Sequence, residues 1–237
     1  MHTISLDPEV LRRVSRWREV EHVFQQIDPA KTAHLVIDMQ NAFTAPGSEM
    51  EVPVAREIVP NINTISRAVR AAGGVNLFAQ MTIDAETERN WSVWLRYFCD
   101  AERSEATREA LRRGSDGHAL DPGLEVLDGD VLFDKRRYSP LVPGASDLHV
   151  MLVERGIDTL IITGTVTNCC CESTARDAMQ MDYRVIFISD GTAALSDSDH
   201  NASLNNMVSI FADVMSTSEV VEFLEHSTDV SPPAGVG

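Results

Sequence analysis

The stretch DTLIITGTVTNCCCESTARDA (residues 158–178) decides the fold. Its first part, residues 158–164, is an apolar run that is too short for a typical helix, so it predicts a buried strand. A short turn follows, and the pattern over residues 168–181 then favours a helix. A buried strand that leads directly into a helix is the repeating unit of proteins built around a parallel sheet.

The same unit recurs on both sides of this stretch. Glycines that follow periodic apolar segments suit the ends of helices. Apolar strands that alternate with amphipathic helices indicate an α/β fold, with helices on both faces of a parallel sheet. Further strands are predicted over residues 33–39, 74–81, 130–135, 183–190 and 211–216, and helices over residues 53–73, 147–156 and the C-terminal end.

The length of 237 residues suits one full-sized α/β domain, which we place at residues 31–226. Residues 1–30 are interpreted as a helical N-terminal extension, and residues 227–237 as a flexible tail. The apolar positions that suggest a helix in the extension are Leu11, Val14, Trp17, Val20 and Val23.

Residues 84–128 contain no clear strand. Within them, NWSVWLRYF (90–98) places Trp91, Trp94, Leu95 and Phe98 at positions i, i+3, i+4 and i+7. This spacing predicts a helix that packs an apolar stripe. The alternative is a pocket wall or lid, because long insertions at strand exits often cover active sites. The sequence leaves open whether the segment is a wall, a lid or an interface.

The charge balance excludes some partners. The chain has 20 basic and 36 acidic residues, a net charge of −16, which disfavours nucleic acid and anionic membranes. We expect no secretory leader and no membrane-spanning segment. The four cysteines are Cys99 and the run 169–171, which matches neither a disulfide framework nor a common zinc signature. A reducing, cytoplasmic compartment is therefore expected.

Polar residues at strand exits are the candidates for chemistry, because parallel sheets bind ligands beyond the carboxyl ends of their strands. Asp38, Lys135, the turn before the cysteines, and Asp190 meet this condition. Each has an ordinary alternative, such as a turn-forming carboxylate or a solvent-facing lysine.

The cysteine run lies where the strongest strand meets a helix N-terminus. Unpaired N–H groups there lower the pKa of a thiol and can donate to an oxyanion, so we expect a stabilised thiolate. Successive helical residues point about 100° apart, so one cysteine at most faces a given pocket. Position alone does not choose among the three, and a free cysteine is most often a small buried hydrophobe.

Three blocks, IDMQNAF, KRRYS and GTVTNCCCESTARDA, follow one another in this order at strand exits. Together they resemble the isochorismatase-like cysteine hydrolases over residues 33–222. The resemblance implies a three-layer α/β/α fold with a six-stranded parallel sheet. It also implies an Asp-Lys-Cys triad formed by Asp38, Lys135 and Cys170.

The resemblance implies further roles around this triad. A non-proline cis peptide between Thr165 and Val166 would aim the N–H groups of Val166 and Cys170 at the oxyanion. Cys169 and Cys171 take positions that relatives usually fill with apolar residues, so they are interpreted as packing residues. The carboxylate would move the thiol proton to the leaving nitrogen, and the lysine would hold the carboxylate and favour the thiolate.

The reaction that the resemblance implies is hydrolysis of a small amide, ureido or N-carbamoyl substrate through a thioester, without a cofactor or metal. The metal-binding D-x-H pattern of nicotinamidases is absent, and isochorismatases proper lack the cysteine. Candidate substrate contacts are Asn41, Trp94, Arg137 and Tyr138, although local turn or surface roles suit them equally.

Several alternatives stay open. The same triad could hydrolyse a plain amide, lactam, maleamate-like acid or nicotinamide-like substrate. A protein of another class, either a non-catalytic interaction protein or a thiol-redox or metal-binding protein, is the less favoured interpretation. Relatives are often homo-oligomers, so a dimer or tetramer is expected, with the N-terminal extension and the tryptophan stripe as candidate interfaces.

Overall fold

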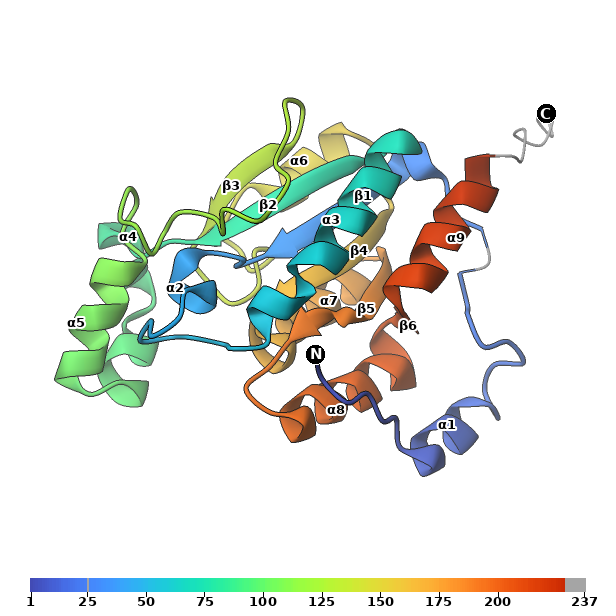
Figure 1. The fold of residues 1–237 in the computed structure, drawn as a ribbon, viewed down its shortest axis with the longest axis horizontal. Coiled ribbons are helices and arrows are strands. Elements are labelled where there is room, and N and C mark those ends of the chain that lie inside the picture. Colours follow the sequence, from blue (N-terminus) through green and yellow to red (C-terminus); the bar gives the residue numbers. More distant parts are fainter. Residues whose placement is uncertain (25, 229–237) are drawn as a thin grey trace.

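A six-stranded sheet forms the centre of the molecule, and all of its paired strands are parallel (Figure 1). The computed structural model describes residues 1–24 and 26–228. The strands lie side by side in the order β3-β2-β1-β4-β5-β6. Their bounds are β1 Thr32–Ile37, β2 Val75–Met81, β3 Val131–Lys135, β4 Thr159–Thr165, β5 Arg184–Ala193 and β6 Asp213–Met215. The predicted α/β fold with six parallel strands is confirmed.

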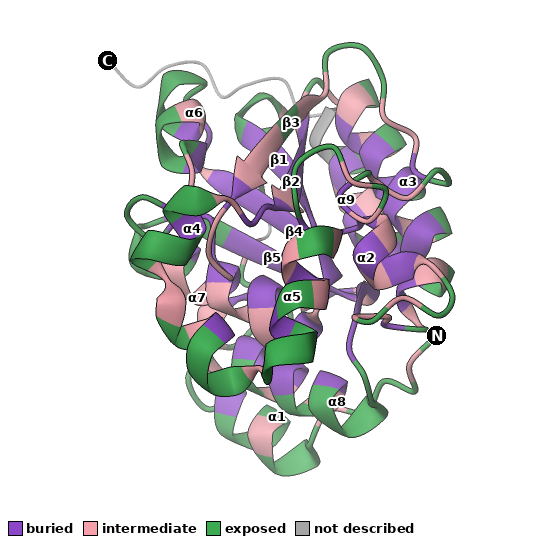
Figure 2. Ribbon diagram, turned by 90° about the vertical axis from the view of Figure 1, so that its left-hand side faces the viewer, coloured by how far each residue is buried: buried purple, intermediate pink, exposed green. Residues whose placement is uncertain are grey.

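Helices cover both faces of this sheet. The long helix α3 and the C-terminal helix α9 pack on one face, and α6, α7 and α8 cover the other (Figure 1). Figure 2 shows the strands buried between these layers, while the outer faces of α1, α4 and α5 are exposed. The bounds of the covering helices are α3 Ala55–Ala71, α6 Leu148–Glu154, α7 Glu172–Gln180, α8 Asp197–Asn206 and α9 Thr217–Thr228.

Every residue of β1 is buried, because the strand has a helical layer on each side. Successive side chains of the strand point to opposite faces of the sheet, so they pack alternately against the two helical layers. Leu35 and Ile37 pack in the cluster that includes α6 and α7, whereas Val36 packs with residues of α3. His34 also faces the α3 side, where its Nδ1 lies 3.1 Å from the Ser66 hydroxyl.

The strand order reverses direction at the centre of the sheet, between β1 and β4. The connections from these two strands lead to opposite sides, which opens a crevice beyond their carboxyl ends. The turn η3 (Thr167–Cys171) follows β4, and the short helix α2 (Asn41–Thr44) follows shortly after β1. The sheet topology therefore places the first and third sequence blocks next to each other.

The N-terminal extension is less helical than its sequence pattern predicts. Helix α1 spans only Pro8–Val14, and the short 3-10 turn η1 (Pro29–Lys31) precedes β1. Val14 is buried, but Trp17 is 66% exposed. Short amphipathic helices depend on burial of their apolar face, and the predicted positions Trp17, Val20 and Val23 stay exposed. The predicted tail lies outside the described residues from position 229 onward.

The segment that lacks a predicted strand forms three helical pieces beyond the carboxyl ends of β2 and β3 (Figure 1). They are α4 (Ala85–Asn90), the π-helical turn η2 (Trp94–Phe98) and α5 (Ala101–Ala110). The predicted single stripe is wrong in its last member, because the π-helical turn breaks the 3.6-residue period and leaves Phe98 76% exposed. A further π-helical turn, η4 (Met207–Phe211), extends α8.

None of the helices in the described part of the chain is long and apolar enough to cross a membrane.

Candidate active site

The Lys135 side chain is the hub of a buried polar cluster at the carboxyl ends of three strands. Its Nζ lies 2.8 Å from Asp38 Oδ2 in an ion pair, and it donates to Cys170 Sγ at 3.4 Å. It also donates to the carbonyl oxygen of Arg137 at 3.0 Å. Lys135 is completely buried as the last residue of β3. The structure thus brings together the three residues that the sequence blocks suggested.

Asp38 follows β1 in a conformation that non-glycine residues rarely adopt. Its φ is 51°, in the left-handed region, which costs about 1–2 kcal/mol for an ordinary residue. Its N–H still donates to the Ala79 carbonyl at 3.0 Å. The carboxylate is fully buried, and neither oxygen has a hydrogen-bond partner of ordinary geometry among the described residues. The charge of Lys135 is therefore the main compensation for burying this carboxylate.

Cys170 lies in η3, directly after β4. The cis peptide bond between Thr165 and Val166, which the resemblance implied, is present at the start of this turn. Cys170 is 6% exposed, and its carbonyl accepts the Thr174 hydroxyl at 2.6 Å. Gly164 is the glycine that this geometry requires, because a Cβ there would overlap the backbone of Ile37. The turn consequently lies against the end of β1.

The charges in the cluster shift each pKa in a definite direction. Burial raises the pKa of Asp38 above its usual range, although the Lys135 charge opposes this. Burial alone would lower the pKa of Lys135, but the charge of Asp38 and the hydrogen bonds with Asp38 and Cys170 raise it above its ordinary value. Lys135 therefore stays an ammonium at neutral pH, and Asp38 is a stronger base than an exposed carboxylate.

The expected low pKa of the cysteine is wrong for this state of the site. The hydrogen bond with Cys169 and burial raise the pKa of Cys170 well above its usual value, although the Lys135 charge opposes them. The same hydrogen bond lowers the pKa of Cys169. The raised pKa favours a protonated Cys170 thiol at rest.

A cavity of about 280 Å³ opens over Cys170. Its volume suits a small substrate. A larger hollow of about 420 Å³ lies between the N-terminal segment and β6, but none of Asp38, Lys135 and Cys170 lines it. The cavity over Cys170 is lined by Phe43, Glu49, Met50, Glu51, Val52, Met81, Trp94, Arg103, Tyr138, Val166, Cys169, Cys170 and Leu195.

Two of the four predicted substrate contacts face this cavity. Trp94 and Tyr138 both line it, and their ring centroids are 5.8 Å apart in an edge-on arrangement. Trp91 extends the aromatic cluster, with its ring 4.8 Å from that of Tyr138. Within residues 84–128, η2 and α5 therefore contribute a pocket wall through Trp94 and Arg103.

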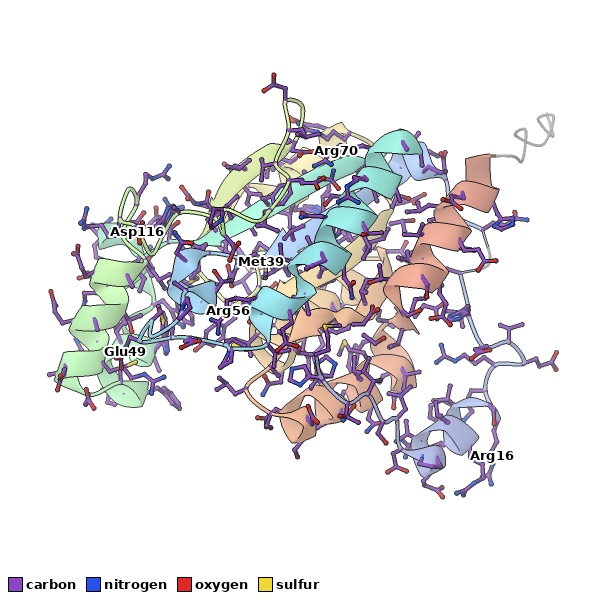
Figure 3. All side chains as sticks on the ribbon, in the orientation of Figure 1. Arg16, Met39, Glu49, Arg56, Arg70 and Asp116 are labelled. Carbon is purple, nitrogen blue, oxygen red and sulfur yellow. The ribbon has the colours of Figure 1, made fainter. Side chains whose placement is uncertain are left out.

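The other two predicted contacts lie outside the cavity lining. Asn41 Nδ2 donates at 3.0 Å to the carbonyl of Asp116, which is labelled in Figure 3, and so ties α2 to the loop after α5. The Arg137 guanidinium lies 5.3 Å from the Trp91 ring centroid and donates to the Asn90 carbonyl. These side chains connect the loops around the site.

Asp190, the remaining polar residue that was predicted at a strand exit, lies outside the cluster and stabilises a helix start instead. Its carboxylate accepts the N–H of Thr217 at 2.7 Å and so anchors the start of α9. The site thus draws on three of the strand exits that the sequence indicated.

Most of the cavity lining was missed by reasoning from the sequence, and three of these residues matter most for the chemistry: Cys169, Leu195 and Arg103. Cys169, expected to be a packing residue, instead lines the cavity and is hydrogen-bonded to Cys170. Cys171 is fully buried in the core, as a packing residue should be. Leu195 comes from the loop after β5, and Arg103 from α5. Arg103 is one of several charged residues in α5, and nothing in the sequence distinguishes it from the others. Only the fold shows that it lines the cavity.

No group of three His, Cys, Asp or Glu side chains that could hold a metal ion occurs within residues 1–24 and 26–228.

Comparison with known proteins places this geometry in a family. Residues 32–219 match the family model described as isochorismatase domain. The ureidoacrylate amidohydrolase RutB of Methylobacterium radiotolerans is 33% identical over 198 residues, which cover 78% of this chain and 76% of that protein. RutB of Pseudomonas savastanoi pv. phaseolicola is 31% identical, covering 82% of this chain and 84% of the relative.

A solved structure agrees with these relatives. The crystal structure of a cysteine hydrolase from Pseudomonas syringae pv. phaseolicola superposes with a TM-score of 0.73 at 28% identity, covering 85% of this chain and 95% of that one. The fold is also that of an N-carbamoylsarcosine amidase from Thermoplasma acidophilum, with a TM-score of 0.61 at 24% identity over 79% of this chain and 96% of the other. A family match over most of the chain, with the parallel sheet and the buried cluster at its strand exits, shows that this protein belongs to the isochorismatase family.

Proposed function

We propose that this protein is a cysteine amidohydrolase in which Cys170 is the nucleophile, Asp38 the proton carrier and Lys135 the group that holds both. The observation that carries the proposal is the single buried ammonium, which lies 2.8 Å from a carboxylate and 3.4 Å from a thiol at a small cavity. A nucleophile with a base nearby and a third group that orients them is the usual arrangement of covalent hydrolases.

The protein is a hydrolase that acts on carbon–nitrogen bonds other than peptide bonds. Its mechanism and its substrate class are our proposals. The RutB relatives act on ureidoacrylate by their name, and this supports a ureido or N-carbamoyl acid as the substrate. We assign no cofactor to the reaction.

The first half of the proposed reaction begins with a protonated thiol. Asp38, whose pKa burial raises, takes the proton from Cys170, and Lys135 stabilises the thiolate that forms. The sulfur attacks the carbonyl carbon, so that a C–S bond forms and negative charge develops on the oxygen. We assign the N–H groups of Val166 and Cys170 to that oxyanion.

The second half releases the products. The C–N bond breaks as Asp38 gives its proton to the leaving nitrogen, and ammonia or an amine departs. Water then attacks the thioester or thiocarbamate, with Asp38 as the base, and the Cys170 thiol is restored. A cavity with many apolar walls limits water at the reacting carbonyl until the nitrogen has left.

The position of Arg103 in the cavity lining supports the proposal that the substrate is an acid. Of the described residues that line the cavity, it is the only arginine or lysine, and no carboxylate in that part of the chain pairs with it. The lining also includes Glu49, which lies on the loop beside α5 (Figure 3), and Glu51, which is paired with Arg56 at 2.7 Å. We propose that the guanidinium binds a substrate carboxylate while the carbonyl faces Cys170.

Ammonia release tests the activity. Purified protein is assayed with ureido acids, N-carbamoyl amino acids and simple amides, alongside Cys170→Ala and the control Cys99→Ala. We expect release from ureido or carbamoyl acids by the wild type and the control, and none by Cys170→Ala. Equal release by Cys170→Ala would refute the nucleophile, and release from simple amides alone would refute the substrate class.

The role of Arg103 has its own test. Arg103→Gln should raise KM for an N-carbamoyl acid by about tenfold, the value of one charged hydrogen bond. KM for the corresponding neutral ester should not change. Arg96→Gln is the matched control, since Arg96 lines a different hollow of the surface. An equal change in KM for the acid and the ester would show that Arg103 does not bind the substrate carboxylate.

Two further features of the protein remain proposals. A homo-oligomer is supported by exposed aromatic residues, of which Trp17 and Phe98 are 66% and 76% exposed. Light scattering of the purified chain tests this, and a monomer would contradict it. A reducing compartment such as the cytoplasm is supported by the four free thiols.

A further inference from the structure

The first residues of the chain form a strap along helix α8 (Figure 1). We use the term N-terminal strap for residues 1–7. Asn201 of α8 accepts the Ser5 N–H at 2.8 Å and donates from its side-chain nitrogen to the Thr3 carbonyl at 2.9 Å. Asn205, one turn further, accepts another backbone N–H of the strap at 2.8 Å. In all three hydrogen bonds a backbone group of the strap is joined to an asparagine side chain of α8, so the strap is held along the helix.

The second residue of the strap, His2, has a buried imidazole ring. The His2 side chain is only 3% exposed, and its Nε2 accepts the N–H of Ala194 at 2.9 Å. Because an N–H group can only donate, Nε2 carries no proton, and the ring proton lies on Nδ1. Nδ1 therefore donates to Asp197 Oδ1, which is 2.8 Å away. Both ring nitrogens are used, and the tautomer is fixed.

The His2 ring also reaches the layer behind the nucleophile. It stacks on the His200 ring, with centroids 4.3 Å apart and an interplanar angle of 18°. His200 Nε2 lies 2.9 Å from the Ser189 carbonyl, which can only accept, so Nε2 is the protonated nitrogen. Its Nδ1 then accepts the Thr167 hydroxyl at 3.0 Å, and Thr167 is the first residue of η3.

The bond from His2 to Ala194 has the more direct consequence for the cavity. Ala194 directly precedes Leu195, which forms one wall of the cavity over Cys170. The Leu195 side chain is 69% exposed, so packing contributes little to its placement. The backbone bond at Ala194 therefore holds this wall in position.

We propose that His2 is a positioning residue for substrate binding, and that it sets the place of the Leu195 wall through the Ala194 N–H. The inference rests on the proposed function for its kinetic consequence only. His200 keeps both of its own hydrogen bonds when His2 is absent, so the turn that carries Cys170 stays in place. Loss of His2 should therefore weaken substrate binding and spare the chemical step.

The variants His2→Ala, His2→Gln and the control Ser5→Ala test this. Ser5→Ala keeps the backbone bonds of the strap, and a glutamine amide can accept from Ala194 and donate to Asp197 as the imidazole does. His2→Ala should raise KM about three- to tenfold, the value of one hydrogen bond. Its kcat should change by less than about twofold, because only ground-state placement is altered. His2→Gln and Ser5→Ala should resemble the wild type.

Hydrogen exchange gives a second readout that needs no substrate. The amide of Ala194, followed in a peptide that covers residues 193–196, should exchange faster in His2→Ala and not in the other two variants. Unchanged exchange, or a fall in kcat at constant KM, would overturn the inference. A wild-type protein that hydrolyses nothing would refute the proposed function, while the exchange result would still decide the role of His2.

Discussion

At the scale of single residues, Cys170 rests as a protonated thiol because two effects oppose the charge of Lys135. The hydrogen bond with Cys169 is the larger contribution to the raised pKa, and burial is the second. In the proposed mechanism, a nucleophile that is protonated at rest needs a base, and the buried carboxylate of Asp38 is suited to that role. Cys169 thus affects the pKa of Cys170 while it also lines the cavity.

Removal of the Cys169 thiol should make Cys170 more acidic. In Cys169→Ala the hydrogen bond that raises the Cys170 pKa is absent, so the thiolate should form at lower pH. The rate of alkylation of Cys170 by iodoacetamide, mapped by peptide mass spectrometry from about pH 6 to about pH 10, reports this. The control Cys99→Ala should keep the wild-type profile. An unshifted curve for Cys169→Ala would contradict the role of the hydrogen bond.

The Asp38–Lys135 pair should behave as one unit in unfolding experiments. Lys135→Met leaves an uncompensated buried carboxylate, which should cost about 3–5 kcal/mol of stability. The double variant Asp38→Asn with Lys135→Met removes both charges and should recover much of that loss. Urea unfolding measures the stabilities, and both variants should be inactive. Additive losses in the double variant would show that the two side chains do not interact.

At the scale of elements, the strands could be predicted almost to their ends, but the turns between them could not. Long apolar runs such as residues 158–164 have one favourable environment, the inside of a sheet. The π-helical turn Trp94–Phe98 gave no such signal, because local packing against Tyr138 and α5 decides its period. The prediction of a helix beyond Val14 was wrong for a similar reason, since apolar periodicity alone does not supply a surface on which a helix can pack.

The contact between β4 and β1 depends on Gly164. Its φ is 113°, and a Cβ would overlap the Ile37 backbone, so Gly164→Ala should lose several kcal/mol, on the order of 3 or more. The matched control is Gly144→Ala, where φ is 77° and no atom lies within 4 Å of the added carbon. It should lose only about 1 kcal/mol from backbone strain. Equal losses in thermal unfolding would show that strain, and not close approach, explains Gly164.

At the scale of the whole molecule, the meeting of Asp38, Lys135 and the cysteine run at one edge of the sheet was predictable, and the resemblance singled out Cys170, but the cavity was not predictable. Asp38, Lys135 and Cys170 each lie at a strand exit, and parallel strands bring their exits to one edge. The cavity walls come from several elements, among them α2, η2, α5 and the loop after β5, whose relative positions depend on tertiary packing. The same limit applies to the direction of the Cys170 pKa, which depends on burial and on a neighbouring thiol.

Buried histidines should set the acid limit of stability. Burial lowers the pKa of His34 to about 3 and that of His200 to about 4, from an ordinary value of 6.5. Between pH 6.5 and these values the unfolded chain binds more protons than the folded one, so stability should fall as the pH is lowered through this window. His34→Gln removes one of these groups and should flatten the fall in urea unfolding measured at several pH values. A slope equal to that of the wild type would contradict the assignment to His34.

The most direct measurement of the central claim is intact-protein mass spectrometry of enzyme quenched with acid during turnover of an N-carbamoyl or ureido acid. We predict a covalent adduct with the mass of the acyl or carbamoyl group, mapped by peptide analysis to Cys170 and absent from Cys170→Ala. Cys169→Ala should still form it. An adduct on Cys169, or turnover with no adduct under conditions in which the second step is slow, would contradict the account.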